Sequence, residues 1–415
     1  MRISALLRSG PAAWAALVLV PVLVWFSAQN TESVIAYWPS ISSRTTVVVG
    51  FISAACGAGA AWEAARLKQG GITVLAPARG LLCVATLHLG PIALLGLIAM
   101  IAPFAVVMAS VTSTSGFPNP AILAVSYSVV LAHIALGWFV GSRMPRLLGA
   151  ATMLIFGYLW GFWPAALGGL PWLRHLNGQG VTECCGLDQE PSIRSLAATV
   201  TFSLAIVTAV VLSSALHHRL WRPLLSLTGF TVATTAALAL AVPLGFHGTQ
   251  PRDTALRTCT GHNPQICLWP EQNTRRTDIS QWAQETTAQL ASVGVTPARQ
   301  IEFGDSQPDK ANVASNVATS PLPDEAPPCA LRQGAAYPGD QAVIAIYAWL
   351  SLAGGVPKSD LARRWPLEAI TLAEQIRALP TQTQHAWYER NMRSVHDCEV
   401  LPDLAPASYT EAAAS

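Results

Sequence analysis

The chain has 415 residues, of which 52% are hydrophobic and 12% are charged, whereas an ordinary soluble domain carries roughly 25% charged residues. This composition excludes a disordered protein and argues against an average cytosolic enzyme and a nucleic-acid-binding protein. Residues 1–251 contain 12 Lys and Arg but 5 Asp and Glu, whereas residues 252–415 contain 13 and 18. The two parts of the chain are therefore expected to lie in different surroundings.

Residues 1–250 are predicted to form an all-α transmembrane domain of about seven helices. A helix needs about 20 mostly apolar residues to cross the hydrocarbon core of a bilayer. The segments that meet or approach this length are residues 11–27, 45–65, 81–109, 121–141, 147–164, 195–216 and 223–246. The first could instead belong to a signal peptide, but Phe26 occupies a position where a small residue is expected.

The basic residues predict the orientation of these spans. Nine Lys and Arg residues lie before the first span or in the loops after the second, fourth and sixth, whereas three lie in the alternate loops. Because cytoplasmic loops carry the excess of Lys and Arg, the N-terminus is predicted to be cytoplasmic and the C-terminus extracytoplasmic. Together with a preference for Arg over Lys that suggests a GC-rich bacterial genome, this indicates a multi-pass protein of a bacterial plasma membrane.

Three ionisable residues fall within predicted spans, where such groups are costly and often functional. Glu63 lies three residues before Arg66, so the two can form an ion pair on one helix face. His88 and His133 lie deeper, and each is a candidate for a proton or substrate pathway or for a hydrogen bond between helices. No Lys lies in any span, which excludes a retinal Schiff base.

The loop of residues 66–80 is short and basic and contains an apolar patch closed by a proline. Such a loop suits docking onto a cytosolic protein, with Arg66, Lys68, Leu75 and Arg79 as candidate docking residues. Its composition is equally typical of an ordinary cytoplasmic loop.

Residues 251–400 are predicted to form a small α+β domain outside the membrane. Residues 257–269 are typical of a β-hairpin, and residues 300–303 of another strand. Residues 278–281 have the pattern of a capping box that opens a helix, and Gly294 is expected to end that helix.

The remainder of this domain is expected to be helical except for two segments. Residues 304–328 have almost no large apolar side chains, which predicts a mobile loop, and residues 401–415 are predicted to be a disordered tail. Pro366 suits the first turn of a helix. Residues 341–353 are apolar but too short for an eighth span, so they are expected to form a buried core helix.

Six cysteines fall on the side predicted to be extracytoplasmic, where an oxidising environment favours disulfides. Adjacent cysteines bond to each other only with strain, so Cys184 and Cys185 are each expected to pair elsewhere. A metal site is the alternative, but no C-x-x-C pair with zinc spacing occurs. The candidate disulfide cysteines are Cys184, Cys185, Cys259, Cys267, Cys329 and Cys398.

Catalytic motifs are not found in the sequence. It contains no phosphate-binding loop, no metallopeptidase helix and no nucleophile elbow, so we expect no enzymatic activity, no catalytic residue and no cofactor. His385, Glu389 and His396 could bind a metal, but three polar residues on an exposed helix face are the favoured interpretation, and we expect no metal.

The stretch AWEAARL (Ala61–Leu67), the run CTGHNPQICLWPE (Cys259–Glu271) and the order of the spans resemble a group of actinobacterial integral membrane proteins. That group is similar to ABC-2-type transporter permeases with an uncharacterised extracytoplasmic C-terminal domain. The resemblance implies a permease-like subunit whose energy comes from a separate cytosolic ABC ATPase, docked at the loop after the second span.

The expected partners are therefore this ATPase, membrane lipid and further subunits of an oligomer, with no nucleic acid. A membrane sensor or scaffold whose extracytoplasmic domain binds a ligand is the alternative function.

Overall fold

The computed structural model describes residues 10–31, 34–71, 81–111, 114, 116–182, 184–215, 222–330 and 337–410. The chain divides into two compact units, here called the N-terminal unit (Met1–Asp253) and the C-terminal unit (Thr254–Ser415). The sequence predicted a boundary three residues earlier, after residue 250.

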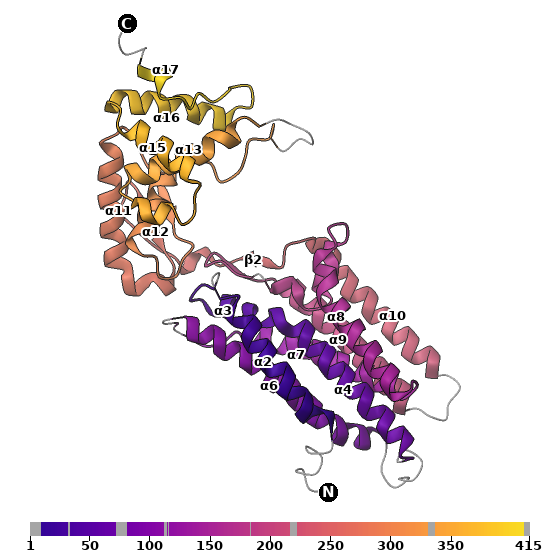
Figure 1. The fold of residues 1–415 in the computed structure, drawn as a ribbon. Helices are drawn as coiled ribbons and strands as arrows, with labels where there is room; N and C mark the ends of the chain where they lie inside the picture. Colours follow the sequence, from indigo (N-terminus) through magenta and orange to yellow (C-terminus); the bar gives the residue numbers. More distant parts are fainter. Residues whose placement is uncertain are drawn as a thin grey trace. The chain divides into compact units, whose positions relative to one another are not determined.

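The N-terminal unit is a bundle of long apolar helices, drawn side by side in Figure 1. Within the described residues, seven helical segments are long and apolar enough to cross a membrane, which confirms the predicted number. This helix composition is that of a multi-pass membrane protein. The long helices are α2 (Pro11–Ala28), α4 (Val49–Gln69), α6 (Leu81–Ser110), α7 (Pro120–Gly141), α8 (Arg146–Ala166), α9 (Ile193–Ala215) and α10 (Arg222–Ala241).

Helix α4 is at the centre of this bundle because small residues let its neighbours approach closely. A Cβ atom at Gly137 of α7 would lie 2.2 Å from the carbonyl oxygen of Gly57, and one at Gly161 of α8 would lie 2.5 Å from the Cα atom of Gly50. Helices in lipid associate through such close packing of small residues. Helix α4 is thus held between α7 and α8, and it continues a short helix, α3 (Trp38–Arg44), through the 3₁₀ turn η1 (Thr45–Val48).

Short irregular segments close one end of the bundle. They comprise the 3₁₀ turns η2 (Pro171–His175), η3 (Gln179–Val181) and η4 (Val242–Leu244) and the antiparallel pair β1 (Gln189–Pro191) and β2 (Thr249–Pro251). The β1–β2 pair joins the segment before α9 to the segment after α10.

The C-terminal unit combines a small sheet with a helical core. Strands β3 (Thr258–Thr260) and β4 (Gln265–Leu268) form the predicted hairpin, and β5 (Gln300–Glu302) pairs with β4 in parallel. The helices are α11 (Arg276–Ala291), α12 (Lys310–Thr319), α13 (Gly339–Ala353), α14 (Lys358–Leu361), α15 (Leu367–Arg377), α16 (Thr381–His396) and α17 (Ala407–Thr410), with 3₁₀ turns η5 (Thr254–Leu256) and η6 (Pro270–Arg275).

Helix α13 contains residues 341–353, the apolar segment that is too short for an eighth span. Its residues Trp349 and Leu350 are fully buried, and Trp349 packs 5.9 Å, centroid to centroid, from the ring of Trp387 in α16. The segment is therefore the centre of a water-excluded core in its own unit.

Several local predictions in this unit are wrong. Helix α12 lies within the predicted mobile loop, because Val313 and Val317 recur at helical spacing, are fully buried, and follow a side-chain cap from Asp309 to the backbone N–H of Asn312 at 2.8 Å. Helix α11 begins at Arg276, directly after η6, so residues 278–281 are not its capping box.

The C-terminal tail and the start of α15 also differ from prediction. Tyr409 packs against the core and donates a hydrogen bond to the carbonyl oxygen of Asp403 at 3.0 Å, so residues 401–410 are not a disordered tail. Residues 411–415 lie outside the described part of the chain. Pro366 caps α15 instead of lying in its first turn.

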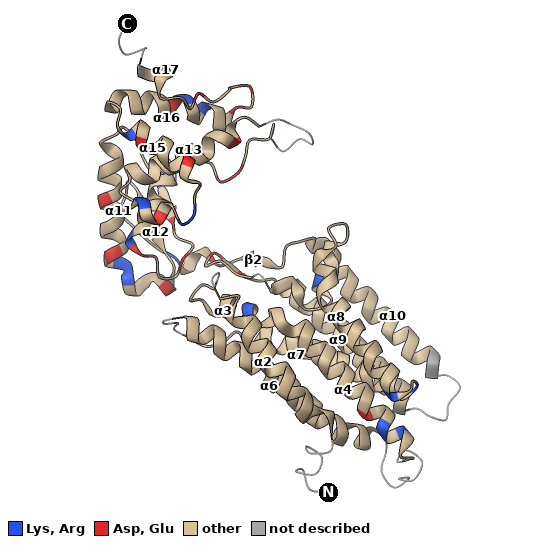
Figure 2. Ribbon diagram, in the orientation of Figure 1, with Lys and Arg blue, Asp and Glu red and all other residues tan. Residues whose placement is uncertain are grey.

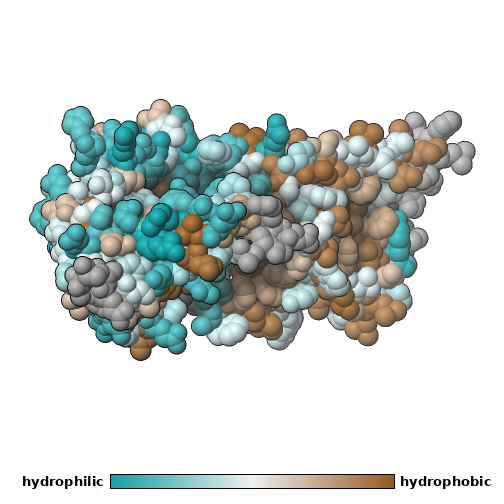
Figure 3. Space-filling view, turned by 90° about the horizontal axis from the view of Figure 1, so that it is seen from above, coloured by the Kyte–Doolittle hydropathy of each residue, from teal (hydrophilic) through white to brown (hydrophobic). Residues whose placement is uncertain are grey.

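Charge separates the two units in the structure as it does in the sequence. Figure 2 shows acidic and basic residues spread over the C-terminal unit, whereas those of the helical bundle are few and lie mainly near helix ends. Figure 3 shows hydrophobic residues gathered on the surface of the bundle and hydrophilic residues on the C-terminal unit. An apolar outer surface of this kind suits a lipid environment.

Candidate functional site

A buried carboxylate connects two helices of the bundle. Glu63 of α4 is 3% exposed, and its Oε1 atom lies 2.5 Å from Nη2 of Arg66 and 3.0 Å from Nδ1 of His88. Arg66 follows Glu63 on the same helix, whereas His88 belongs to α6. We call these three residues the Glu63 cluster.

The Glu63 cluster stabilises a charge that would otherwise be costly inside the bundle. Arg66 neutralises the carboxylate, and the Nδ1 atom of His88 can donate to the same oxygen. The second oxygen of Glu63, Oε2, is buried and has no hydrogen-bond partner among the described residues. It can therefore accept a proton or one further hydrogen bond from a group that enters the cluster.

Sequence reasoning found part of this cluster. The predicted ion pair between Glu63 and Arg66 is present, but His88 was considered separately from them. Glu63 and His88 are 25 residues apart, and their contact depends on how far α6 is shifted along α4. A single sequence carries no signal for that shift.

The candidate docking loop begins next to the Glu63 cluster. Arg66 and Lys68 lie in the last turn of α4, and Lys68 is exposed. Leu75 and Arg79 lie outside the described residues. Because α4 ends at Gln69 and α6 begins at Leu81, the contact between Glu63 and His88 joins the two helices on either side of the loop.

His133 is separate from this cluster. Its ring is 2% exposed in α7, and Nδ1 lies 2.9 Å from the carbonyl oxygen of Val129, one turn earlier. Its Nε2 atom is buried with no partner among the described residues. Among the described residues, no hydrogen bond or ion pair links His133 to Glu63. Its observed hydrogen bond is local to α7, and its ring lies 6.1 Å, centroid to centroid, from that of Phe156 in α8.

His175 is a buried histidine that sequence reasoning did not single out. Its Nδ1 atom lies 2.8 Å from the hydroxyl of Ser195, and Nε2 lies 3.1 Å from the carbonyl oxygen of Gly245. A neutral ring accepts from the serine and donates to the carbonyl, which joins η2, α9 and the end of η4. Burial lowers the pKa of His175, and the nearby Arg174 charge lowers it further, against the opposing hydrogen bond to Gly245.

The six candidate disulfide cysteines are all paired, but the expectation that Cys184 and Cys185 each pair elsewhere is wrong. Cys259 pairs with Cys267 across the β3–β4 hairpin, and Cys329 pairs with Cys398. Cys184 and Cys185 are bonded to each other, contrary to prediction. Cys184 and Cys185 lie in the N-terminal unit, whereas the other four cysteines pair with one another within the C-terminal unit. None of those four is therefore left to pair with Cys184 or Cys185.

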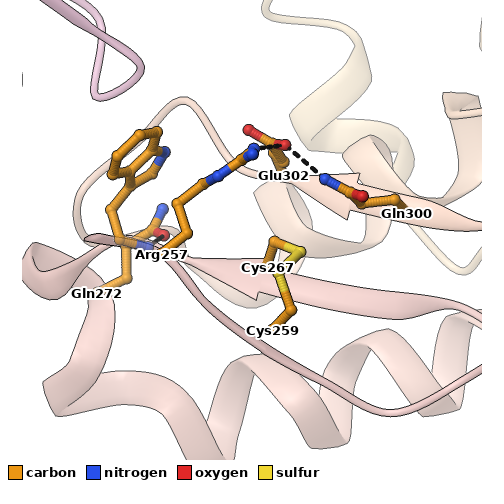
Figure 4. A network of polar contacts seen from close by, with 7 residues as sticks. Arg257, Cys259, Cys267, Gln272, Gln300 and Glu302 are labelled. Atoms are coloured by element: carbon orange, nitrogen blue, oxygen red, sulfur yellow. Dashed lines mark hydrogen bonds and ion pairs between the residues drawn. A yellow bond between two sulfur atoms is a disulfide. The ribbon is translucent and has the colours of Figure 1, made fainter. Parts of the chain in front are cut away.

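The sheet of the C-terminal unit carries a polar network (Figure 4). Arg257 forms an ion pair with Oε1 of Glu302, and the side-chain nitrogen of Gln300 donates to the same oxygen at 2.8 Å. The buried Gln272 accepts from the backbone N–H of Trp269 and donates to the carbonyl oxygens of Phe303 and Asp305. These contacts brace the disulfide-linked hairpin against β5 and the segment that follows it.

The possible metal ligands of α16 are not gathered into a site. His385 Nε2 lies 4.0 Å from Glu389 Oε1; the His385 side chain is partly exposed and that of Glu389 is largely exposed. Within the described residues, no group of three or more His, Cys, Asp or Glu side chains is close enough to hold a metal ion.

Comparison with known proteins identifies one region. Residues 266–398, about a third of the chain, match a family model described as a domain of unknown function (DUF7224). No curated protein and no solved structure matches the chain. The match runs from β4 to just past α16 and includes the second half of the Cys259–Glu271 run. It names no activity and does not extend to the membrane helices, so the chain is similar to this family through its C-terminal unit alone.

Proposed function

We propose that the protein is a membrane-embedded, permease-like subunit of a transport system that is powered by a separate cytosolic ABC ATPase. The observation that carries the proposal is the contact between Glu63 and His88, which joins the helices on either side of the candidate docking loop.

Helix α4 is suited to transmit a movement of that loop. It contacts α2, α6, α7 and α8, so a displacement of α4 at Gln69 would alter its packing against most of the bundle. Close packing through small residues makes such a helix move as a rigid element instead of deforming locally. The exposed Lys68 supplies positive charge at the end where the partner would dock, whereas the charge of Arg66 is balanced by Glu63.

The Glu63 cluster also supplies a polar group inside an apolar bundle. Transport pathways use such groups, because a carboxylate buried among helices can exchange a proton or hydrogen-bond a polar substrate. In this proposal, movement of α4 relative to α6 breaks and reforms the contact with His88 and so changes the access of Glu63 Oε2.

A second candidate function is ligand sensing by the C-terminal unit. A polar cleft of about 40 Å³ lies between α12, α13 and α14. Arg364 lies against it and contacts Oδ1 of Asn312 at 3.2 Å, and the rings of Tyr347 and Trp365 lie 4.4 Å apart, centroid to centroid, at its wall. The volume suits a small group such as one carboxylate, for which arginine is a good partner.

Affinity purification distinguishes the two functions. The tagged chain is isolated from its own membranes in mild detergent, and the copurifying proteins are identified by mass spectrometry. We expect a nucleotide-binding ATPase subunit, lost with Lys68→Glu but retained with the matched control Arg143→Glu, which lies in another predicted cytoplasmic loop. If no ATPase copurifies with the unaltered chain, the transport proposal is abandoned in favour of the sensor.

A further inference from the structure

A large apolar groove opens on one side of the helical bundle. It has a volume of about 710 Å³ and lies between α2, α4 and α8. Exposed side chains line its rim, among them Val18 (69%) and Tyr158 (50%), whereas Ala58 lies at its floor on α4. We call it the α2–α4–α8 groove.

One end of this groove has an aromatic and a cationic side chain. Trp62 of α4 lines the groove, and the guanidinium carbon of Arg146 lies 3.7 Å from the centre of its ring. Arg146 is the first residue of α8, and its Nε atom is buried with no hydrogen-bond partner among the described residues. A donor of this kind is unsatisfied until an acceptor arrives.

We propose that the α2–α4–α8 groove binds an acyl chain of an anionic glycerophospholipid whose phosphate is held by Arg146. Guanidinium groups bind phosphate oxygens through directed, charge-assisted hydrogen bonds. Indole rings prefer the membrane interface, where one side is apolar and the other is wet. Arg146 begins α8 at the end that the charge pattern predicts to be cytoplasmic, and the cytoplasmic leaflet is rich in anionic lipid.

A second groove on the same bundle sharpens the choice of ligand. It lies between α6, α7 and α9, has a volume of about 370 Å³, and is also lined by apolar residues. As in the first groove, no lining residue is charged, but among the described residues no arginine lies over one of its lining rings as Arg146 lies over Trp62. An anionic lipid should therefore prefer the groove that ends at Arg146.

A second copy of the chain is a poorer occupant on grounds of charge. Glu63 is the single Asp or Glu between residues 33 and 182, and it is already paired with Arg66. Another bundle packed over the groove would thus cover Arg146 without supplying a free carboxylate, whereas a phospholipid supplies a phosphate at the required end.

Native mass spectrometry of the full-length protein in detergent tests the proposal. After delipidation, the protein is titrated with phosphatidylglycerol and with phosphatidylcholine of the same acyl chains. We expect phosphatidylglycerol to bind about five-fold more tightly to the unaltered chain, as one basic residue near a membrane surface predicts. Arg146→Gln should remove this preference, and the matched control Arg143→Gln should retain it.

Filling the groove provides an independent test. Ala58→Leu should weaken the binding of both lipids, because the added side chain occupies the floor. The proposal is overturned if Arg146→Gln and Arg143→Gln behave alike or if Ala58→Leu leaves lipid binding unchanged. It is also overturned if Ala58→Leu converts a dimer into a monomer without changing lipid binding, because a second copy of the chain would then be the occupant of the groove.

Thermal unfolding of each variant shows whether it is folded in detergent. If Arg146→Gln unfolds, Arg146→Lys keeps the charge and must keep the preference for phosphatidylglycerol. Loss of that preference in a folded Arg146→Lys variant that still binds phosphatidylcholine would contradict the assignment of the phosphate to this position.

Discussion

His88 Nδ1 lies 3.0 Å from Glu63 Oε1, and through this contact α6 is attached to α4 inside the helical bundle. The two residues are 25 positions apart and on either side of the candidate docking loop. The contact makes the Glu63 cluster a point where a force on the loop can reach the interior of the bundle.

A double-mutant cycle measures the strength of this contact. Glu63→Gln and His88→Ala should each destabilise the bundle, and their effects should be non-additive by about 1–2 kcal/mol because they share one interaction. The measurement is unfolding of the purified protein in detergent.

The control for this cycle pairs Glu63 with His133, which packs against α4 about six residues away from Glu63. Glu63→Gln and His133→Ala should be additive within about 0.5 kcal/mol. Additivity of Glu63→Gln with His88→Ala would show that the contact contributes nothing to stability.

The stability of the N-terminal unit should fall in mild acid because of His175. Its ordinary pKa is 6.5 and burial lowers it in the folded state, so above pH 6.5 the ring is neutral both folded and unfolded. Below this pH the unfolded chain takes up a proton that the folded chain excludes, and stability is lost by at most about 1.4 kcal/mol per pH unit until the lowered pKa is reached.

Thermal unfolding between pH 7.5 and pH 5.0 checks this expectation. His175→Gln does not titrate, and its amide can still donate to Gly245, so it should lose less stability over the same range than the unaltered chain. An identical loss in both proteins would place the acid sensitivity elsewhere.

The two disulfides of the C-terminal unit should differ in their contribution to stability. Cys329 and Cys398 are 69 residues apart, whereas Cys259 and Cys267 are 8 apart. Each disulfide lowers the entropy of the unfolded chain. This effect predicts a stabilisation of about 4.4 kcal/mol by the Cys329–Cys398 disulfide and about 2.5 kcal/mol by the Cys259–Cys267 disulfide. Calorimetry of the double variants Cys329→Ser/Cys398→Ser and Cys259→Ser/Cys267→Ser measures the stability lost without each disulfide. A larger loss of stability on removing the Cys259–Cys267 disulfide would contradict the prediction.

The predicted orientation is tested by labelling single introduced cysteines with a membrane-impermeant maleimide in intact cells. Lys68 and Glu325 are both exposed, and they lie in different units. In a Cys83→Ser background, we expect labelling of Glu325→Cys and protection of Lys68→Cys. The reverse pattern would invert the orientation, and labelling after cell lysis controls for access.

Much of the fold could be predicted because the strongest signals are local. Long apolar runs predicted the helices of the bundle, and turn residues between two cysteines predicted the β3–β4 hairpin. Helix α12 was missed because its buried face is made of Val, Ala and Ser, and small residues in a polar segment resemble a loop.

The candidate site was harder to predict because it depends on contacts between distant segments. Glu63 and Arg66 are neighbours on one helix, so their pairing follows from helical spacing. The contacts of Glu63 with His88 and of His175 with Ser195 depend on the packing of different elements. The bond between Cys184 and Cys185 likewise depends on how the chain divides into units.

Site-specific photocrosslinking in intact membranes tests whether α4 and the loop after it receive force from a cytosolic ATPase. A photoreactive amino acid at Lys68 should capture a nucleotide-binding subunit, and the same group at Arg143 should not. Capture of the ATPase from Lys68 would support this coupling. Absence of any ATPase from the Lys68 product, with the bundle folded and the crosslinker active, would contradict it.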